Sequence, residues 1–268
     1  SAPPKPPPPE PPPPPPRAPP PPAVVEFWDG LATPSPEFID LDLDGDLDLV
    51  VSGGDLSYYE NVDGTLVLID HADAASPFYD TQLPNGTAFS LDIADLDGDG
   101  SPDLVIGDGA GGLLNGPFVG GRFSLLSSGS PPLGSVSVGG SSVPEFADLN
   151  GDGLLDLLLG MEDGRLVFLA NLGNATHAEY GDASTGCYVA LRSGPVECSQ
   201  TSWPGSHLRV GNGFSSPAGA DLDSDGDIDF IIGGADGSLR YLENLGVVNG
   251  VPSFHEHTGG TDPLRGIG

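Results

Sequence analysis

The stretch Asp40-Leu-Asp-Leu-Asp-Gly-Asp-Leu-Asp48 places aspartates at alternate positions around a central glycine. The same pattern of oxygen-bearing residues and glycine returns three more times. The later copies are Asp95-Leu-Asp-Gly-Asp-Gly-Ser-Pro-Asp103, Asp148-Leu-Asn-Gly-Asp-Gly-Leu-Leu-Asp156 and Asp221-Leu-Asp-Ser-Asp-Gly-Asp-Ile-Asp229. The copies begin at residues 40, 95, 148 and 221, and the last interval is the longest. Self-similarity at a period of about 55 residues indicates one supersecondary unit per repeat.

Each copy places oxygen-bearing side chains at positions 1, 3, 5 and 9, with a turn-forming glycine at position 6. Calcium accepts six to eight oxygen ligands in flexible geometry, whereas magnesium demands a tighter octahedron and dehydrates reluctantly. The loops contain no thiolate or imidazole for softer metals. We therefore expect one calcium ion per loop, about four in all. By position, with position 7 offering its backbone carbonyl, the predicted ligand residues are Asp40, Asp42, Asp44, Asp46 and Asp48; Asp95, Asp97, Asp99, Ser101 and Asp103; Asp148, Asn150, Asp152, Leu154 and Asp156; and Asp221, Asp223, Asp225, Asp227 and Asp229.

The residue at position 12 separates these loops from EF-hand loops. An EF-hand requires a bidentate glutamate there, but the four loops have Val51, Ile106, Leu159 and Ile232. Each loop runs directly into a short apolar stretch rich in leucine and β-branched residues. These stretches, residues 49–51, 104–107, 157–160 and 230–233, are predicted to be buried strands.

The segments around each loop predict further strands. A first strand precedes the loop, as at 36–38 and 144–146, with looser versions at 88–90 and 217–219. A third strand follows the buried one at 56–61, 166–171 and 239–244, and is shorter at 113–115. A fourth is expected at 66–69 and 253–257. Four strands per repeat describe a propeller blade, so the predicted fold is all-β, a propeller-like array of four blades.

At these loops and third strands the chain resembles the FG-GAP or VCBS repeats of calcium-binding β-propellers, a family found in integrin α-chain heads and many secreted proteins. The resemblance covers about residues 35–268. It implies that each loop joins the first and second strands of a blade, and that calcium stiffens this connection without performing chemistry.

Composition divides the chain into an arm and a domain. Residues 1–22 are mostly proline, which predicts a polyproline II arm. The domain is then 23–268, with repeats at about 33–88, 89–140, 141–214 and 215–268. The formal net charge of −31 would repel nucleic acid and anionic membranes. Because no apolar run approaches the roughly 20 residues of a membrane span, no membrane insertion is expected.

Several features indicate a secreted, extracellular or cell-surface protein. Cys187 and Cys198 lie close together in the inserted segment of the third repeat, which favours a local disulfide, although a pair of buried thiols stays open. Asn85 and Asn174 begin glycosylation sequons in predicted loops. The sequence starts without a signal peptide, so we expect a mature chain or a trimmed start.

Enzymatic signatures are absent from the sequence. There is no Gly-x-Ser-x-Gly elbow and no phosphate-binding Gly-Lys-Ser/Thr, and Lys5 is the only lysine. His255 and His257 form one close histidine pair, for which an exposed strand face is favoured over a zinc site. The regular repetition of the carboxylates is explained by metal binding, which leaves no odd pair for glycoside hydrolysis. We therefore expect a non-enzymatic protein.

Two functional classes fit the sequence. The first is a structural subunit of an extracellular fibril, wall or surface appendage, because the proline-rich arm resembles those of hydroxyproline-rich wall glycoproteins. The alternative is an adhesin or a propeller module that binds glycans or other surface proteins. The repeat pattern also predicts open sheet edges at both ends of the array. Either the four blades close into a ring, or neighbouring subunits and their arms cover these edges and form a filament. We favour the filament.

Overall fold

The computed structural model describes residues 35–53, 56–81, 83, 90–126, 129–134, 136–180, 213–248, 251–257 and 264. In these residues the chain forms strands, turns and loops, and no helix there is long and apolar enough to cross a membrane. The predicted arm at 1–22, the cysteine pair Cys187 and Cys198, and the sequon at Asn85 all lie outside the described residues. Predictions for those segments therefore stay predictions.

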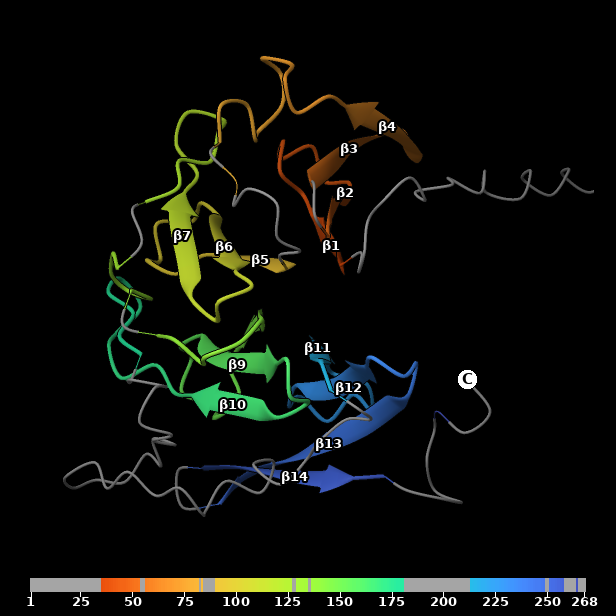
Figure 1. Ribbon diagram of the computed structural model, residues 1–268, viewed down its shortest axis with the longest axis vertical. Coiled ribbons are helices and arrows are strands. Elements are labelled where there is room, and N and C mark those ends of the chain that lie inside the picture. Colours follow the sequence, from red (N-terminus) through yellow and green to blue (C-terminus); the bar gives the residue numbers. More distant parts are fainter. Residues whose placement is uncertain are drawn as a thin grey trace, which may run out of the picture.

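The described strands form four small antiparallel sheets (Figure 1), as the all-β prediction requires. The first sheet contains β1 (Ser35–Ile39), β2 (Asp48–Ser52), β3 (Leu56–Val62) and β4 (Thr65–Ile69). The second contains β5 (Ser90–Ala94), β6 (Asp103–Gly107) and β7 (Leu113–Pro117). The third contains β8 (Ser142–Ala147), β9 (Asp156–Met161) and β10 (Leu166–Leu169). The fourth contains β11 (Ser215–Ala220), β12 (Asp229–Gly234), β13 (Leu239–Val248) and β14 (Val251–Glu256).

Two details differ from the predicted strands. The first strand of the second unit is β5 at 90–94, two residues later than expected. The second and third sheets have three strands among the described residues, because the next segment makes only isolated bridges, Phe118 with Phe123 and Asn171 with Tyr180. In the second unit the returning segment turns sharply through two glycines with left-handed φ, Gly120 and Gly121, and then lies beside β7. Its pairing is too short and irregular to form a full fourth strand.

The sheets follow one another around a common centre, with their first strands innermost (Figure 1). β1 packs against β5, β5 against β8, and β8 against β11. The second and third sheets therefore each present one face to the sheet before and the other to the sheet after. The metal loops connect the innermost strand to the second strand in every sheet.

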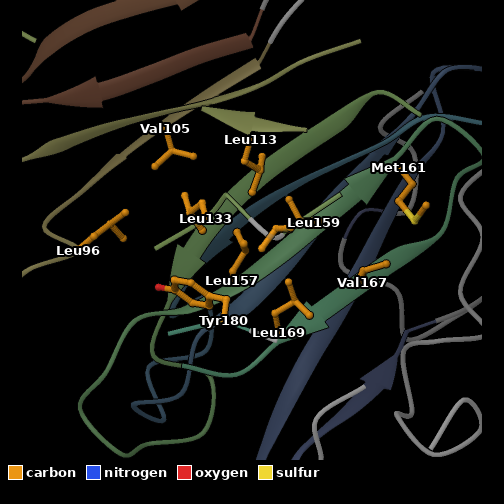
Figure 2. Packing of buried hydrophobic residues seen from close by; sticks show 11 residues of the cluster. Leu96, Val105, Leu113, Leu133, Leu157, Leu159, Met161, Val167, Leu169 and Tyr180 are labelled. Carbon is orange, nitrogen blue, oxygen red and sulfur yellow. The ribbon is translucent and has the colours of Figure 1, made fainter. Parts of the chain in front are cut away.

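The core consists of three apolar layers, one at each junction between consecutive sheets. Figure 2 shows the layer between the second and third sheets, where Val105 of β6 faces Leu157 and Leu159 of β9. Because side chains alternate between the two faces of a strand, Leu104 and Ile106 belong instead to the layer shared with the first sheet. This explains why the second strands read as continuous apolar runs.

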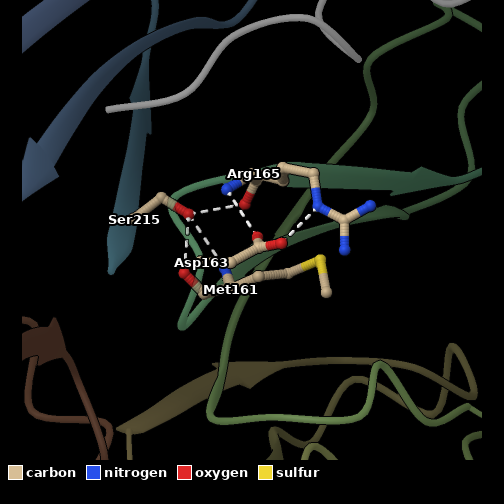
Figure 3. Close-up of polar contacts among 4 residues, drawn as sticks. All are labelled: Met161, Asp163, Arg165 and Ser215. Carbon is tan, nitrogen blue, oxygen red and sulfur yellow. Dashed lines mark hydrogen bonds and ion pairs between the residues drawn. The ribbon is translucent and has the colours of Figure 1, made fainter. Parts of the chain in front are cut away.

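Small residues allow the sheets to approach closely at the junctions. A Cβ atom added at Gly160 would lie 1.9 Å from the backbone oxygen of Ser215, the first residue of β11. The Ser215 hydroxyl accepts a hydrogen bond from the Met161 amide at 2.8 Å and donates one to the Arg165 carbonyl at 2.6 Å (Figure 3). The start of the fourth sheet is thus held within the β9–β10 turn.

Three acidic side chains, Glu37, Asp92 and Glu145, lie on the inner strands, and the last two connect one sheet to the next. Asp92 accepts a hydrogen bond from the Phe146 amide of β8 at 2.6 Å. Glu145 accepts one from the Gly219 amide of β11 at 2.7 Å. Asp92 and Glu145 therefore each satisfy a backbone donor on the next inner strand.

Burial raises the pKa of all three carboxyl groups, and repulsion between charges raises it further at Glu37 and Glu145. Burial, followed by the charge of Asp92, raises the pKa of Glu37 to about 7 and that of Glu145 to about 8, and burial raises the pKa of Asp92 to about 6. The strand β11 contributes no ionisable side chain to this group. Since the folded chain holds these protons more tightly than the unfolded chain, its stability falls as the pH rises from about 5 to about 8.

We expect Glu145→Gln to reduce this pH dependence. The glutamine keeps an oxygen for the Gly219 amide but carries no charge, so the variant should be more stable than the parent at pH 8 and nearly equal to it at pH 5. Urea unfolding at saturating calcium, repeated across this pH range, measures the difference. Glu179→Gln, at an exposed position, is the matched control. A parent whose stability is constant from pH 5 to pH 8 would contradict this account.

Candidate metal centre

The predicted metal loops are the connections from β1 to β2, β5 to β6, β8 to β9 and β11 to β12. In three of them the side chains at positions 1, 3 and 5 gather so that one carboxylate oxygen from each lies within 4.8 Å of the others. These clusters are Asp40, Asp42 and Asp44; Asp95, Asp97 and Asp99; and Asp221, Asp223 and Asp225. The sequence-predicted ligands at positions 1, 3 and 5 are therefore brought together.

The third loop has an asparagine at position 3 and the same internal hydrogen bonds as the other loops. The Asn150 amide oxygen accepts from the Asp152 amide at 2.9 Å, and Asp152 accepts from the Leu154 amide at 2.9 Å. In the first loop Asp42 accepts from the Asp44 amide at 3.2 Å, and Asp44 from the Asp46 amide at 2.9 Å. The third loop thus turns in the same way, with a neutral oxygen in place of one carboxylate.

Two positions of each loop adopt left-handed backbone conformations. Position 6 is glycine in every copy, as expected for a sharp turn, with φ between 83° and 98°. Position 4 also has positive φ, at Gly98 and Gly151 but also at Leu43 (62°) and Ser224 (66°). Sequence reasoning missed this second turn position, although glycine at position 4 in two copies is its signal. The double turn points the carboxylates at positions 1, 3 and 5 inward.

The aspartate at position 9 lies beneath each loop and connects it to the sheet. Asp229 is 0% exposed, and its carboxylate accepts hydrogen bonds from the Leu222 amide, the Asn244 amide and the Tyr241 hydroxyl, at 3.1, 2.8 and 3.0 Å. Asp48 makes the equivalent three contacts in the first loop, at 3.1, 2.8 and 2.9 Å. This residue therefore holds the loop against the end of the third strand.

A carboxylate has about four acceptor positions, so three such hydrogen bonds leave room for one metal contact. An asparagine of the third strand, Asn61 in the first sheet and Asn244 in the fourth, supplies one of these amides. The predicted metal-ligand roles of position 9 and of the position 7 carbonyl stay predictions.

Without a bound cation, the negative charges of the loop carboxylates repel one another. Burial raises the pKa of Asp103 to about 6 and that of Asp156 to about 7, and in both cases neighbouring aspartates of the same loop raise it further. The pKa of the exposed Asp42 is raised in the same direction by desolvation and by three aspartates beside it. A divalent cation among these oxygens would offset the repulsion. The donor set consists of oxygen atoms only, which fits calcium.

The other predicted sites have different surroundings. His257 pairs with Glu243 and stacks on Tyr241 at 4.9 Å, while the ring of His255 lies edge-on to it at 4.8 Å. Among the described residues, the groups of side chains that lie close enough together to hold a metal ion contain no histidine.

Asn174, the predicted glycosylation site, is exposed, and its amide oxygen accepts hydrogen bonds from the Thr176 amide and hydroxyl at 3.1 and 3.0 Å. Glycosylation there stays a prediction.

Comparison with known proteins agrees with this geometry. Residues 40–106, which include the first two loops and the strands between them, match the family model described as FG-GAP-like repeat. This part of the chain is therefore similar to FG-GAP-like repeats. The chain is also distantly similar to integrin alpha-PS2 of Drosophila melanogaster, at 28% identity over 159 residues. That match covers 54% of this chain and 10% of the integrin chain, so the chain spans about a tenth of the length of this relative.

These similarities support the general properties predicted from the sequence. FG-GAP-like repeat proteins are typically non-catalytic binding modules, and integrin-α-like repeats are usually extracellular domains. The three Asp-x-Asp-x-Asp clusters indicate calcium sites. The number of ions and the biological role of the array belong to the proposal that follows.

Proposed function

We propose that this chain is a non-enzymatic, calcium-binding extracellular protein whose blades serve as a structural subunit of a larger assembly. The observation that supports it most directly is the repetition of one loop geometry at the same place in all four sheets. Each loop joins the innermost strand to a buried second strand, so an ion bound there stiffens the connection between them. Because the same site recurs at four connections between strands, we assign it a role in stability and not in catalysis.

The proposal includes four calcium ions, one per loop. The third loop lacks one carboxylate, but Asn150 supplies an oxygen at the same place and the hydrogen bonds of the turn are unchanged. Because affinity depends on the number of charged ligands, the third site should bind calcium more weakly than the other three. Isothermal titration calorimetry should then resolve about four sites, one of them weaker.

The structural role is proposed from the succession of sheets around a centre, together with the proline-rich arm predicted at 1–22. In this proposal the ends of the array associate with neighbouring copies, and the arm helps to hold them in a filament. A second candidate is an adhesin that recognises a glycan or another surface protein. The similarity to integrin alpha-PS2 favours it, since FG-GAP-like repeats are typically binding modules.

Negative-stain microscopy of the intact chain distinguishes the two roles. We expect filaments in calcium and dispersed particles after chelation. Deleting residues 1–22 should leave a folded, calcium-binding domain that no longer forms filaments. If the intact protein forms only separate particles in calcium, the structural role is wrong and the adhesin candidate takes its place. If the deletion variant assembles as well as the parent, the arm is a spacer only.

A further inference from the structure

A short hairpin of the third unit, residues 171–180, contacts the metal loops of two different units. After β10 the chain forms antiparallel bridges between Asn171 and Tyr180 and between Asn174 and His177. The first pair is the base of the hairpin and the second pair is its tip. We call this segment the bridging hairpin.

The base of the bridging hairpin is held by the third metal loop. The Asn171 amide donates a hydrogen bond to the carboxylate of Asp156, position 9 of that loop, at 2.9 Å. The Tyr180 hydroxyl donates one to the carbonyl of Leu155, position 8 of the same loop, at 2.8 Å. Both Asn171 and Tyr180 are buried. The hairpin is therefore fixed to the residues that close the third loop.

The tip of the bridging hairpin lies against the second metal loop. A Cβ atom added at Gly98, position 4 of that loop, would lie 2.1 Å from the backbone oxygen of Ala175. Gly98 stands between Asp97 and Asp99, two predicted ligands of the loop. Of the six glycines in the four loops, only Gly98 has an atom of a described residue within 4 Å of such a Cβ. The hairpin thus covers the second loop at the centre of its predicted ligands.

Apolar side chains join the bridging hairpin to the same two loops. Tyr180 and Leu96, position 2 of the second loop, belong to the apolar layer between the second and third sheets (Figure 2). Ala178 of the hairpin and Leu155 of the third loop pack against this layer. Because protein interiors are closely packed, the hairpin cannot leave the second loop without disturbing these contacts.

We propose that the bridging hairpin couples calcium binding in the second and third loops, so that an ion in either loop favours an ion in the other. An ion in the third loop fixes Leu155 and Asp156, and with them the base of the hairpin. The tip then stays against Gly98 and holds the second loop in its binding geometry. The proposal rests on the calcium binding suggested under Proposed function and adds that these two sites fill together.

The coupling has its largest consequence at the third loop, where Asn150 replaces a charged ligand. A loop whose geometry is already held binds an ion more tightly, because less ordering accompanies binding. Occupation of the second loop therefore raises the affinity of the third. Since coupling between two binding sites is reciprocal, the third loop raises the affinity of the second by the same factor.

One glycine amide in each loop provides a separate signal for that loop. The amide at position 6 donates a hydrogen bond to the carboxylate at position 1, at 3.0 Å in the first and second loops and 2.8 Å in the third. These amides belong to Gly45, Gly100 and Gly153. An NMR titration of the intact chain with calcium gives a midpoint for each of them. Salt at about 0.15 M screens direct interactions between ions in different loops.

Silencing one loop tests the effect on the other. Asp99→Asn keeps an oxygen at position 5 of the second loop but removes its charge, which moves the Gly100 midpoint. We expect the Gly153 midpoint in the third loop to rise as well, by about fivefold or more. Asp152→Asn in the third loop should raise the Gly100 midpoint by a similar factor. Asp44→Asn, the same change in the first loop, is the matched control and should leave the Gly153 midpoint unchanged.

A second substitution locates the coupling in the bridging hairpin. The side-chain oxygen of Asn171 accepts hydrogen bonds from the Gly173 and Glu179 amides at 3.0 and 3.1 Å. Asn171→Ala removes both bonds but keeps the backbone contact with the third loop and the net charge. In this variant Asp99→Asn should no longer change the Gly153 midpoint.

Asn61→Ala is the matched control for the hairpin variant. Asn61 lies on the third strand of the first sheet, and its side chain donates to the Leu47 carbonyl of its own loop. The coupling should persist in this control. Circular dichroism melting establishes that each variant is folded. Tyr180→Phe, which removes only the hydroxyl at the base of the hairpin, should reduce the coupling if Asn171→Ala does not fold.

Three results separate the possible failures. A Gly153 midpoint that stays in place while Asp99→Asn moves that of Gly100 would overturn the coupling and leave the calcium sites intact. An equal shift of Gly153 by Asp44→Asn, or coupling that survives Asn171→Ala, would exclude the hairpin as its cause. Glycine amides that do not respond to calcium in the parent would instead overturn the calcium sites, and the coupling with them.

Discussion

Removal of calcium should lower the melting temperature of this chain by about 10 °C or more. Each ion that binds only the folded state stabilises it by about 2.7 kcal/mol when its concentration is 100 times its dissociation constant, and the sites proposed in the loops add such contributions. Without cations the loop aspartates repel one another, as the raised pKa values of Asp103 and Asp156 indicate. Differential scanning calorimetry in calcium and in excess chelator measures the shift.

A single substitution locates this effect in the loops. Asp44→Asn keeps an oxygen at position 5 of the first loop but removes the charge, so it should weaken that site and reduce the stabilisation by calcium. Asp63→Asn makes the same change of charge at an exposed turn of the same sheet. Its backbone has φ of 51°, which asparagine tolerates well. Equal melting temperatures with and without calcium in the parent, or equal calcium responses in the two variants, would refute the role assigned to the loops.

Much of this fold could be predicted because its signals are local. The spacing of the loop aspartates fixes a turn, and the apolar stretch after each loop is long enough for one buried strand. The predicted second strands at 49–51, 104–107, 157–160 and 230–233 all lie within or overlap β2, β6, β9 and β12. Turns and single strands are determined by a few neighbouring residues, so they can be predicted from the sequence alone.

Features that depend on the packing of one sheet on the next could not be predicted in this way. Glu145 reads as an ordinary strand residue, and only the approach of β11 shows that it accepts the Gly219 amide. The aspartate at position 9 was predicted as a metal ligand from its spacing. Its contacts with the third strand depend on long-range pairing that no local pattern specifies. The uncovered state of Leu222 likewise follows from its place in the last described sheet, since its local sequence matches that of the buried Leu41.

The glycines that end the second strands offer the sharpest test of this packing. Gly160→Ala should lower the free energy of unfolding by about 3 kcal/mol, because its methyl group would overlap the Ser215 backbone oxygen at 1.9 Å. Ser215 cannot easily withdraw, since its hydroxyl is hydrogen-bonded to Met161 and Arg165. The expected result is separation of the fourth sheet from the third, seen as a lower midpoint in urea unfolding.

Gly233→Ala is the matched control at the corresponding place in the fourth sheet. The nearest atom to its added methyl group is 3.9 Å away, and neither this glycine nor Gly160 has a left-handed φ. The backbone conformation therefore permits alanine at both positions, and only the neighbouring sheet distinguishes them. We expect Gly233→Ala to change the stability of the dilute, monomeric chain by less than about 0.5 kcal/mol. Equal destabilisation by the two substitutions would mean that the third and fourth sheets do not pack in this way.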